Sequence, residues 1–240
     1  MNKFTRIYLR KISISLGCIA TILFSSYLVA GQEIEDRNSY RYVTELSKVK
    51  SECKQGVYKS CFDAAELYRH GQSVKRDYNL AQLFYEKGCS GRDRLSCYMY
   101  ASSLLEGDGF VANADKAEII FNDWCNLGDI EFCQELAYIY GRKGEKSREA
   151  ELYRKVCEGG MSDGCSELVE VYELEQDYIK AQEYAIKSCY LGNQFSCHSA
   201  AEKYQAGSYG RPKNLLEAKK LFEYGCKLGN QKSCDMANSR

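Results

Sequence analysis

The sequence predicts an all-α protein in which helical hairpins repeat along the chain, and three observations carry this prediction. Twelve of the 13 cysteines in the 240 residues form six pairs with the spacing C-x7-C. The first cysteines of successive pairs are 36, 36, 32, 32 and 37 residues apart, a step typical of repeats built from two helices. The chain has one proline, and no run with a period of two residues indicates a β-strand.

The six cysteine pairs are predicted to form local disulfides. Two cysteines eight residues apart on one helix would be separated by roughly 12 Å, whereas a disulfide needs Cα atoms within about 7 Å. The chain must therefore reverse within each pair. Glycines that tolerate a left-handed conformation lie three residues after five of the first cysteines, with Gly91 one residue early. The predicted disulfides are Cys53–Cys61, Cys89–Cys97, Cys125–Cys133, Cys157–Cys165, Cys189–Cys197 and Cys226–Cys234.

Zinc binding and redox catalysis are less favoured interpretations of these cysteines. A structural zinc site usually takes its ligands from closer C-x2-4-C pairs, and redox catalysis favours a C-x-x-C motif with a low thiol pKa. No pair is distinguished from the other five by its spacing. We therefore predict a structural role for the cysteines, with no metal and no cofactor.

Residues 1–30 have the pattern of a signal peptide. Four basic residues precede a mostly apolar run, and small residues around Ala30 and Gly31 offer a cleavage site that would remove the unpaired Cys18. We predict a bacterial periplasmic or secreted protein, in keeping with its disulfides. An uncleaved membrane anchor remains open, because the apolar run is close to the spanning minimum.

The residues after the signal segment predict a lead-in over 31–52, with a helix from about Ser39, and a repeat array over 53–240. Counted from each second cysteine, apolar residues at +3, +4 and +7 form one face of the first helix of a hairpin. Glycine at +10 is expected to end that helix, and Gly141 to end the third one a turn earlier. Asp77, Asn113, Asp177 and Asn214 are expected N-caps of second helices, the third hairpin lacks such a cap, and a last helix is expected over Gln231 to Asn238.

One hairpin carries a recognisable motif. The stretch Tyr68-x-x-Gly71-x-x-Val74-x-x-Asp77-x-x-x-Ala81, followed by Phe84, Tyr85 and Cys89, resembles the Sel-one-like repeat, a relative of the tetratricopeptide repeat. With a C-x7-C pair in every unit, the chain is similar to the Helicobacter cysteine-rich proteins. The resemblance implies an α/α right-handed superhelix with one disulfide per repeat. The two 32-residue units depart from that family's longer loop.

The resemblance also implies slow β-lactam hydrolysis or penicillin binding, which we keep as the alternative function. Serine β-lactamases use a Ser-x-x-Lys nucleophile together with Ser-Asp-Asn and Lys-Thr-Gly elements. Ser47–Lys50 and Ser51–Lys54 match the first form, but the other two elements do not occur. The two histidines, His70 and His198, are too few for a typical hydrolytic metal site. We therefore assign no catalytic residue.

A ligand groove is the favoured site, because first helices line the concave face of related solenoids. Positions +1, +2 and +5 are left over from core packing and are rich in aromatic and acidic residues, which suit an extended peptide or a basic partner. Glu167 falls at +2, and the candidate groove residues are Phe62, Glu66, Tyr98, Glu135, Tyr138, Glu170 and His198.

The charge of the chain narrows the class of partner. Lysine and arginine number 33, as do aspartate and glutamate, but the first 30 residues hold four basic and no acidic residues. The remainder is therefore net negative, which disfavours nucleic acid. We predict a monomeric scaffold that binds a protein, a peptide or a peptidoglycan fragment without catalysis, and that touches a membrane only through an uncleaved signal segment.

Overall fold

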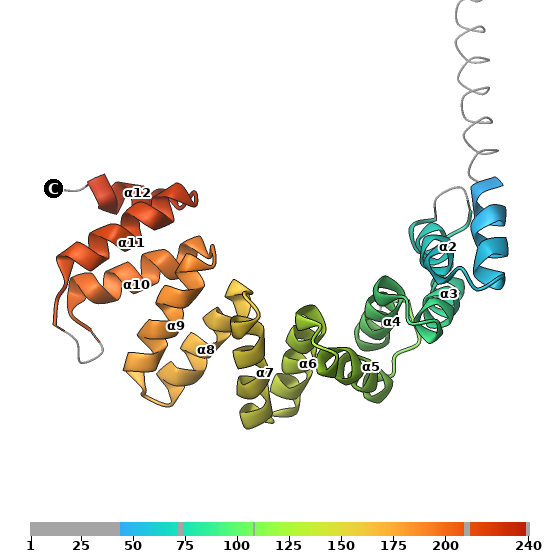
Figure 1. Ribbon diagram of the computed structural model, residues 1–240, viewed down its shortest axis with the longest axis horizontal. Helices are drawn as coiled ribbons and strands as arrows, with labels where there is room; N and C mark the ends of the chain where they lie inside the picture. The colour runs from blue at the N-terminus through green and yellow to red at the C-terminus, as the bar shows by residue number, and fades with distance from the viewer. Residues whose placement is uncertain (1–43, 72–73, 108, 209–211, 239–240) are drawn as a thin grey trace, which may run out of the picture. The chain divides into compact units, whose positions relative to one another are not determined.

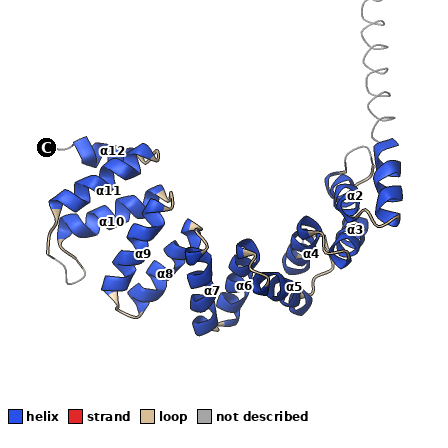
Figure 2. Ribbon diagram, viewed as in Figure 1, coloured by secondary structure: helices blue, strands red, loops and turns tan. Residues whose placement is uncertain are grey.

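The computed structural model describes residues 44–71, 74–107, 109–208 and 212–238, and these residues form helices joined by turns, with no strand among them (Figure 2). The predicted signal peptide and the start of the predicted lead helix lie outside the described residues. Residues 44–54 are helical. Within the described ranges, no helix is both long and apolar enough to cross a bilayer.

The helices form two compact units that divide between Val111 and Ala112. Figure 1 labels the helices from α2 to α12. Within each unit every labelled helix packs against the next one along the chain, as expected for hairpins stacked in a repeat array. Unit 1 holds the helix over 44–54, α2 (Tyr58–His70), α3 (Tyr78–Ser90) and α4 (Arg94–Glu106). Unit 2 holds α5 (Ala114–Asn126), α6 (Ile130–Lys143), α7 (Lys146–Glu158), α8 (Ser162–Leu174), α9 (Tyr178–Tyr190), α10 (Gln194–Ala206), α11 (Leu215–Lys227) and α12 (Gln231–Asn238).

The predicted second-helix caps are confirmed. The side chains of Asp77, Asn113, Asp177 and Asn214 each accept a hydrogen bond from the backbone N–H three residues later, at the starts of α3, α5, α9 and α11. Helix α7 has no such cap, as predicted. These caps satisfy backbone donors that a helix start otherwise leaves unpaired, so the hairpin boundaries are encoded locally.

The glycines that end the first helices are confirmed at three positions and wrong at one. Gly71, Gly107 and Gly207 have the left-handed conformation at the ends of α2, α4 and α10. The sequence predicted that Gly141 ends the third first helix, but α6 continues to Lys143 and ends at Gly144, with φ 77°. Gly141 lies within α6, and a Cβ there would meet the flexible end of the Glu149 side chain from α7, 2.4 Å from Oε1.

All six predicted disulfides are present, with Cα–Cα distances between 4.3 and 4.7 Å. In five of them the glycine three residues after the first cysteine has a φ between 92° and 103°. The prediction that Gly91 plays this part in the Cys89–Cys97 turn is wrong. Arg92 has the positive φ there, and Gly91 lacks a side chain because the Tyr58 ring occupies that space, 2.0 Å from where a Cβ would be.

Each disulfide also brings together the residues that precede its two cysteines, and we call these two residues the pre-cysteine pair. The two members complement each other in size or polarity. Ser60 donates a hydrogen bond to Glu52 at 2.7 Å, the Trp124 and Phe132 rings stack at 5.1 Å, and Ser188 and Ser196 lie 2.9 Å apart. In the other three pairs one member is glycine: Gly88/Ser96, Val156/Gly164 and Gly225/Ser233.

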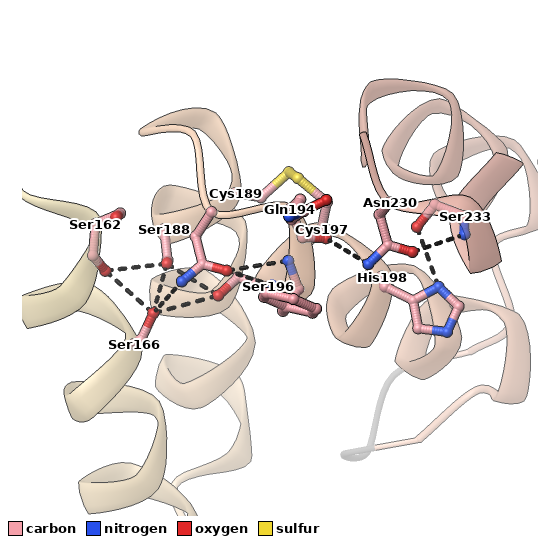
Figure 3. The surroundings of a disulfide bond; sticks show 12 residues. Ser162, Ser166, Ser188, Cys189, Gln194, Ser196, Cys197, His198, Asn230 and Ser233 are labelled. Carbon is pink, nitrogen blue, oxygen red and sulfur yellow. Dashed lines mark hydrogen bonds between the residues drawn. A yellow bond between two sulfur atoms is a disulfide. The ribbon is translucent and has the colours of Figure 1, made fainter. Parts of the chain in front are cut away.

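In unit 2, polar side chains also reach from the residue after one cysteine pair to the pre-cysteine pair of the next disulfide along the chain (Figure 3). Ser166, which follows the second cysteine of its own pair, lies 2.8 Å from Ser188 of the next pre-cysteine pair. His198 holds the equivalent position one repeat later, and its Nδ1 lies 3.1 Å from Ser233. Ser188 and Ser233 are fully buried, so these bonds satisfy polar groups that would otherwise be costly to bury.

The first prediction concerns one disulfide. The double variant Cys125→Ser, Cys133→Ser should lower the free energy of unfolding by about 1–3 kcal/mol, because the short loop becomes unconstrained in the unfolded chain. Hydrogen exchange should show the loss of protection concentrated in α5 and α6. The matching variant Cys53→Ser, Cys61→Ser should loosen unit 1 instead, and an even loss along the chain in either variant would contradict the repeat architecture.

The second prediction concerns the Gly88/Ser96 pair. Glycine to alanine inside a helix normally stabilises by about 0.5–1 kcal/mol, but a Cβ at Gly88 would lie 2.1 Å from Oγ of Ser96. Gly88→Ala should therefore destabilise unit 1 by about 1–3 kcal/mol. Adding Ser96→Gly removes the clashing atoms and should recover part of the loss, as measured by thermal denaturation of both variants. Additive effects would show that the two positions are not coupled.

Candidate functional site

The predicted groove residues of unit 1 take part in contacts within the protein. The Glu66 carboxylate on α2 accepts hydrogen bonds from Arg69 Nη2 at 2.7 Å and from the Tyr85 hydroxyl, and it lies 3.2 Å from Nε2 of His70. Phe62 is half-buried, with its ring 6.0 Å from that of Tyr85.

These contacts set the ionisation of Glu66 and Tyr85. Burial by itself would raise the pKa of Glu66, but the hydrogen bonds from Arg69 and Tyr85 outweigh it and lower that pKa. Burial, followed by the nearby carboxylate, raises the pKa of Tyr85. Glu66 is therefore ionised and already paired, and a ligand would have to compete with internal partners for it.

Tyr98 on α4 is half-buried and has an interaction partner within the protein. Among the candidates of unit 2, Tyr138 on α6 stays 54% exposed, with the Arg142 guanidinium 5.9 Å from its ring centre. Glu135 on α6 is half-buried and Glu170 on α8 is exposed. His198 on α10 is largely enclosed, with 18% of its side chain accessible and its ring 5.4 Å from that of Phe222.

The Ser-x-x-Lys matches lie on the helix over 44–54 in unit 1. Lys50 Nζ donates a hydrogen bond to the Tyr68 hydroxyl at 3.3 Å. Ser51 Oγ accepts a hydrogen bond from the side chain of Gln55 at 3.2 Å. Neither contact joins the serine of a match to its lysine. These contacts therefore give no support to a Ser–Lys catalytic pair.

A cleft between α7 and α8 is the clearest candidate binding site in the described residues. It has a volume of about 330 Å³, and its apolar wall is formed by Ala150, Val171 and Leu174. Leu174 is 82% exposed at the end of α8. Lys146, Ser147, Glu149, Tyr153, Glu167, Glu170 and Glu175 supply the polar lining. An apolar cleft with a few converging polar groups is the usual form of a ligand site.

The polar lining of the cleft is strongly acidic. Four glutamates line it against a single cation, Lys146, whose Nζ lies 2.8 Å from Oε2 of Glu149. The Glu149 side chain is mostly buried, whereas that of Lys146 is 70% accessible. Burial and then the charges of Glu170, Glu149 and Asp163 raise the pKa of Glu167. The cleft thus holds negative charge that its own lysine does not balance.

Tyr153 of α7 also lines the cleft and is only 8% exposed. Its pKa is raised by burial and by the carboxylates of Glu167, Glu149, Glu135 and Glu170, in that order. Its hydroxyl makes no hydrogen bond with any residue that the structure describes. The ring of Tyr153 is buried, but its hydroxyl oxygen is not one of the fully buried side-chain atoms that lack a hydrogen bond, so a ligand in the cleft can reach it.

The sequence indicated part of this site. The repeat register placed Glu167 and Glu170 on the predicted ligand face of a first helix. Glu149 and Tyr153 lie on α7, a second helix, where the sequence predicted no ligand contact. The sequence feature that could have indicated a site at α7 is the shortened loop of the third hairpin, together with the many glutamates of that hairpin. The groove as a whole stays a prediction.

The third prediction concerns the stability that the protein loses because its cleft is lined by carboxylates. Since the folded state raises the pKa of Glu167, ionised Glu167 destabilises the fold above its unfolded pKa of about 4.3. Glu167→Gln should therefore raise the stability at pH 7, by less than about 1 kcal/mol because the side chain is partly solvated. The gain should shrink as the pH falls towards 4, in thermal melts across that range. Glu223→Gln, an exposed residue of α11, is the control, and an equal gain in it would contradict this reading.

Comparisons with known proteins bear on the fold more than on the site. The sequence matches the model of the Sel1 repeat at residues 59–93, 94–129, 171–193 and 196–230, together more than half of the chain. The unmatched stretch 130–170 contains α6, α7 and most of α8, and therefore most of the cleft. No protein with a curated description is significantly similar to the sequence.

Solved structures with the same fold come from several bacteria. A protective antigen of uropathogenic Escherichia coli strains, described as having an SLR fold, superposes with a TM-score of 0.65 at 21% identity, over 80% of this chain and 43% of that protein. This chain thus spans less than half the length of that relative. A Sel1 repeat protein from Oxalobacter formigenes superposes with a TM-score of 0.60 at 15% identity, over 80% and 87% of the two chains. At these identities the likeness shows the fold alone.

Proposed function

We propose that this chain, which belongs to the Sel1 repeat family, is a non-catalytic scaffold that binds a protein or peptide partner outside the cytoplasm. Sel1 repeat proteins commonly mediate protein interactions. Six disulfides indicate an oxidising extracellular or periplasmic environment. We extend this to export through the N-terminal segment and to a monomeric binder, with a peptidoglycan fragment as a further ligand class.

The observation that carries the proposal is the open cleft between α7 and α8. A rigid frame supports it, because the Cys157–Cys165 disulfide joins these two helices at their other end. The exposed Leu174 at its rim gives an apolar contact point next to acidic side chains. Pre-organised surfaces of this kind lose little conformational entropy on binding, and a few apolar or aromatic anchors usually dominate the affinity.

The fourth prediction tests this function by site-specific crosslinking. A photoreactive phenylalanine analogue in place of Leu174 should crosslink a defined partner in cells that export the protein. The same analogue in place of Leu216, which is 66% exposed on α11, is the control for surface exposure. The crosslinked protein, identified by mass spectrometry and purified, should then bind the oxidised chain directly in solution.

Two further variants test whether the predicted groove contributes. Tyr98→Ala and Tyr138→Ala should weaken the binding of that purified partner while helical content stays the same. Ser47→Ala and Ser51→Ala should leave the binding unchanged. The scaffold proposal fails if no partner is crosslinked above the Leu216 control, or if the purified protein hydrolyses a β-lactam such as nitrocefin in a way that depends on Ser47 or Ser51.

A further inference from the structure

We infer that the cleft between α7 and α8 binds a single cationic side chain, lysine or arginine, presented by the partner polypeptide. The inference rests on the proposed function, since it names the chemistry by which the scaffold recognises its partner. It joins two independent features of the cleft. One is unbalanced negative charge, and the other is the largely buried side chain of Tyr153, whose accessible hydroxyl has no hydrogen-bond partner among the described residues.

The charge comes from carboxylates on both helices. Glu149 belongs to α7, whereas Glu167 and Glu170 belong to α8, and all three line the cavity. Lys146 neutralises one of them from an exposed position at the start of α7. Bringing a second cation into the cleft would place it near the two carboxylates that α8 supplies. Glu149 is mostly buried, whereas Glu167 and Glu170 are exposed, so salt should screen the attraction to the carboxylates of α8.

The hydroxyl of Tyr153 supplies the directional contact. A phenol oxygen accepts hydrogen bonds from ammonium or guanidinium N–H groups, and a bond that involves a charged group is stronger than one between neutral groups. Tyr153 is held by packing, with 8% of its surface exposed, so little side-chain entropy is lost when it binds. A cation at this point would satisfy the hydroxyl and the carboxylates together.

The apolar wall decides in favour of a side chain over a bare ion. Ala150, Val171 and Leu174 would contact the methylene stem of lysine or arginine while its charged end meets the acids. Within the described residues, no group of three or more His, Cys, Asp or Glu side chains is arranged to hold a metal ion. The volume of about 330 Å³ is at the small end of ligand sites, which suits one side chain and not a large ligand.

The test uses small blocked amino acids as probes for the oxidised, isotope-labelled protein. N-acetyl-arginine methylamide and its lysine equivalent should shift NMR signals of α7 and α8 and should bind more weakly as salt is added. The citrulline and norleucine equivalents keep the length of the side chain but lack the charge. They should bind at least about tenfold more weakly, the factor expected for hydrogen bonds to a charged group.

Two variants separate the contributions of the site. Tyr153→Phe keeps the buried ring and removes the hydroxyl, and Glu167→Gln keeps the shape and removes one charge. Each should weaken arginine or lysine binding by about tenfold. Tyr190→Phe and Glu223→Gln change exposed residues of α9 and α11 and should leave the binding unchanged.

The outcomes distinguish this inference from the proposed function. Equal binding of citrulline and arginine, shifts confined to other helices, or unchanged binding in both variants would overturn the cation site. If neither basic probe binds but the Leu174 crosslink to a purified partner persists, the site inference is wrong and the scaffold function stands. If the probes bind as expected but no partner is found, the site stands and the scaffold function fails.

Discussion

The covalent reversal of the chain at each C-x7-C pair is the constraint on which the rest of the structure depends. A disulfide with its Cα atoms less than 5 Å apart brings the end of one helix against the start of the next. The residues before the two cysteines must then share one small space. Each pre-cysteine pair solves this differently, by a glycine, by a hydrogen bond or by ring stacking, because only the combined size and polarity of the two side chains is restricted.

Because of these disulfides, the stability of one hairpin depends little on which side chains the other hairpins carry on their surface. In a repeat array, contacts run mainly between adjacent units, and the disulfides reinforce each junction covalently. The cleft between α7 and α8 can therefore carry uncompensated carboxylates, whose repulsion opposes folding locally, without endangering the whole chain. Binding sites commonly oppose stability in this way, because they keep charge and hydrogen-bonding capacity for a partner.

Part of the surface of the first helices is used for contacts within the repeat array and is therefore not free to bind a partner. Residues that follow a second cysteine, such as Ser166 and His198, reach the pre-cysteine pair of the next disulfide along the chain and help satisfy its buried hydroxyls. In unit 2 this position therefore contributes to the junction between repeats. The more exposed side chains, such as Tyr138 and Leu174, are better placed to meet a partner than those that close a junction.

The sequence by itself determined the features that depend on local chemistry. The repeated C-x7-C spacing, with a glycine inside each pair, predicted the six local disulfides, because a disulfide at this spacing requires the chain to reverse. The capping residues Asp77 and Asn113 set helix starts because their side chains bond backbone only three residues away. The tertiary structure decided what depends on residues far apart in the chain. Gly141 lies inside α6, where the carboxylate end of Glu149 from the next helix lies beside it, and Gly144 ends the helix. Glu66, already paired with Arg69 on its own helix, gains a partner from α3 because the Tyr85 hydroxyl reaches it. The cleft exists because α7 brings Tyr153 and Glu149 alongside Glu167 of α8, and the helical period of a single segment carries no information about such neighbours.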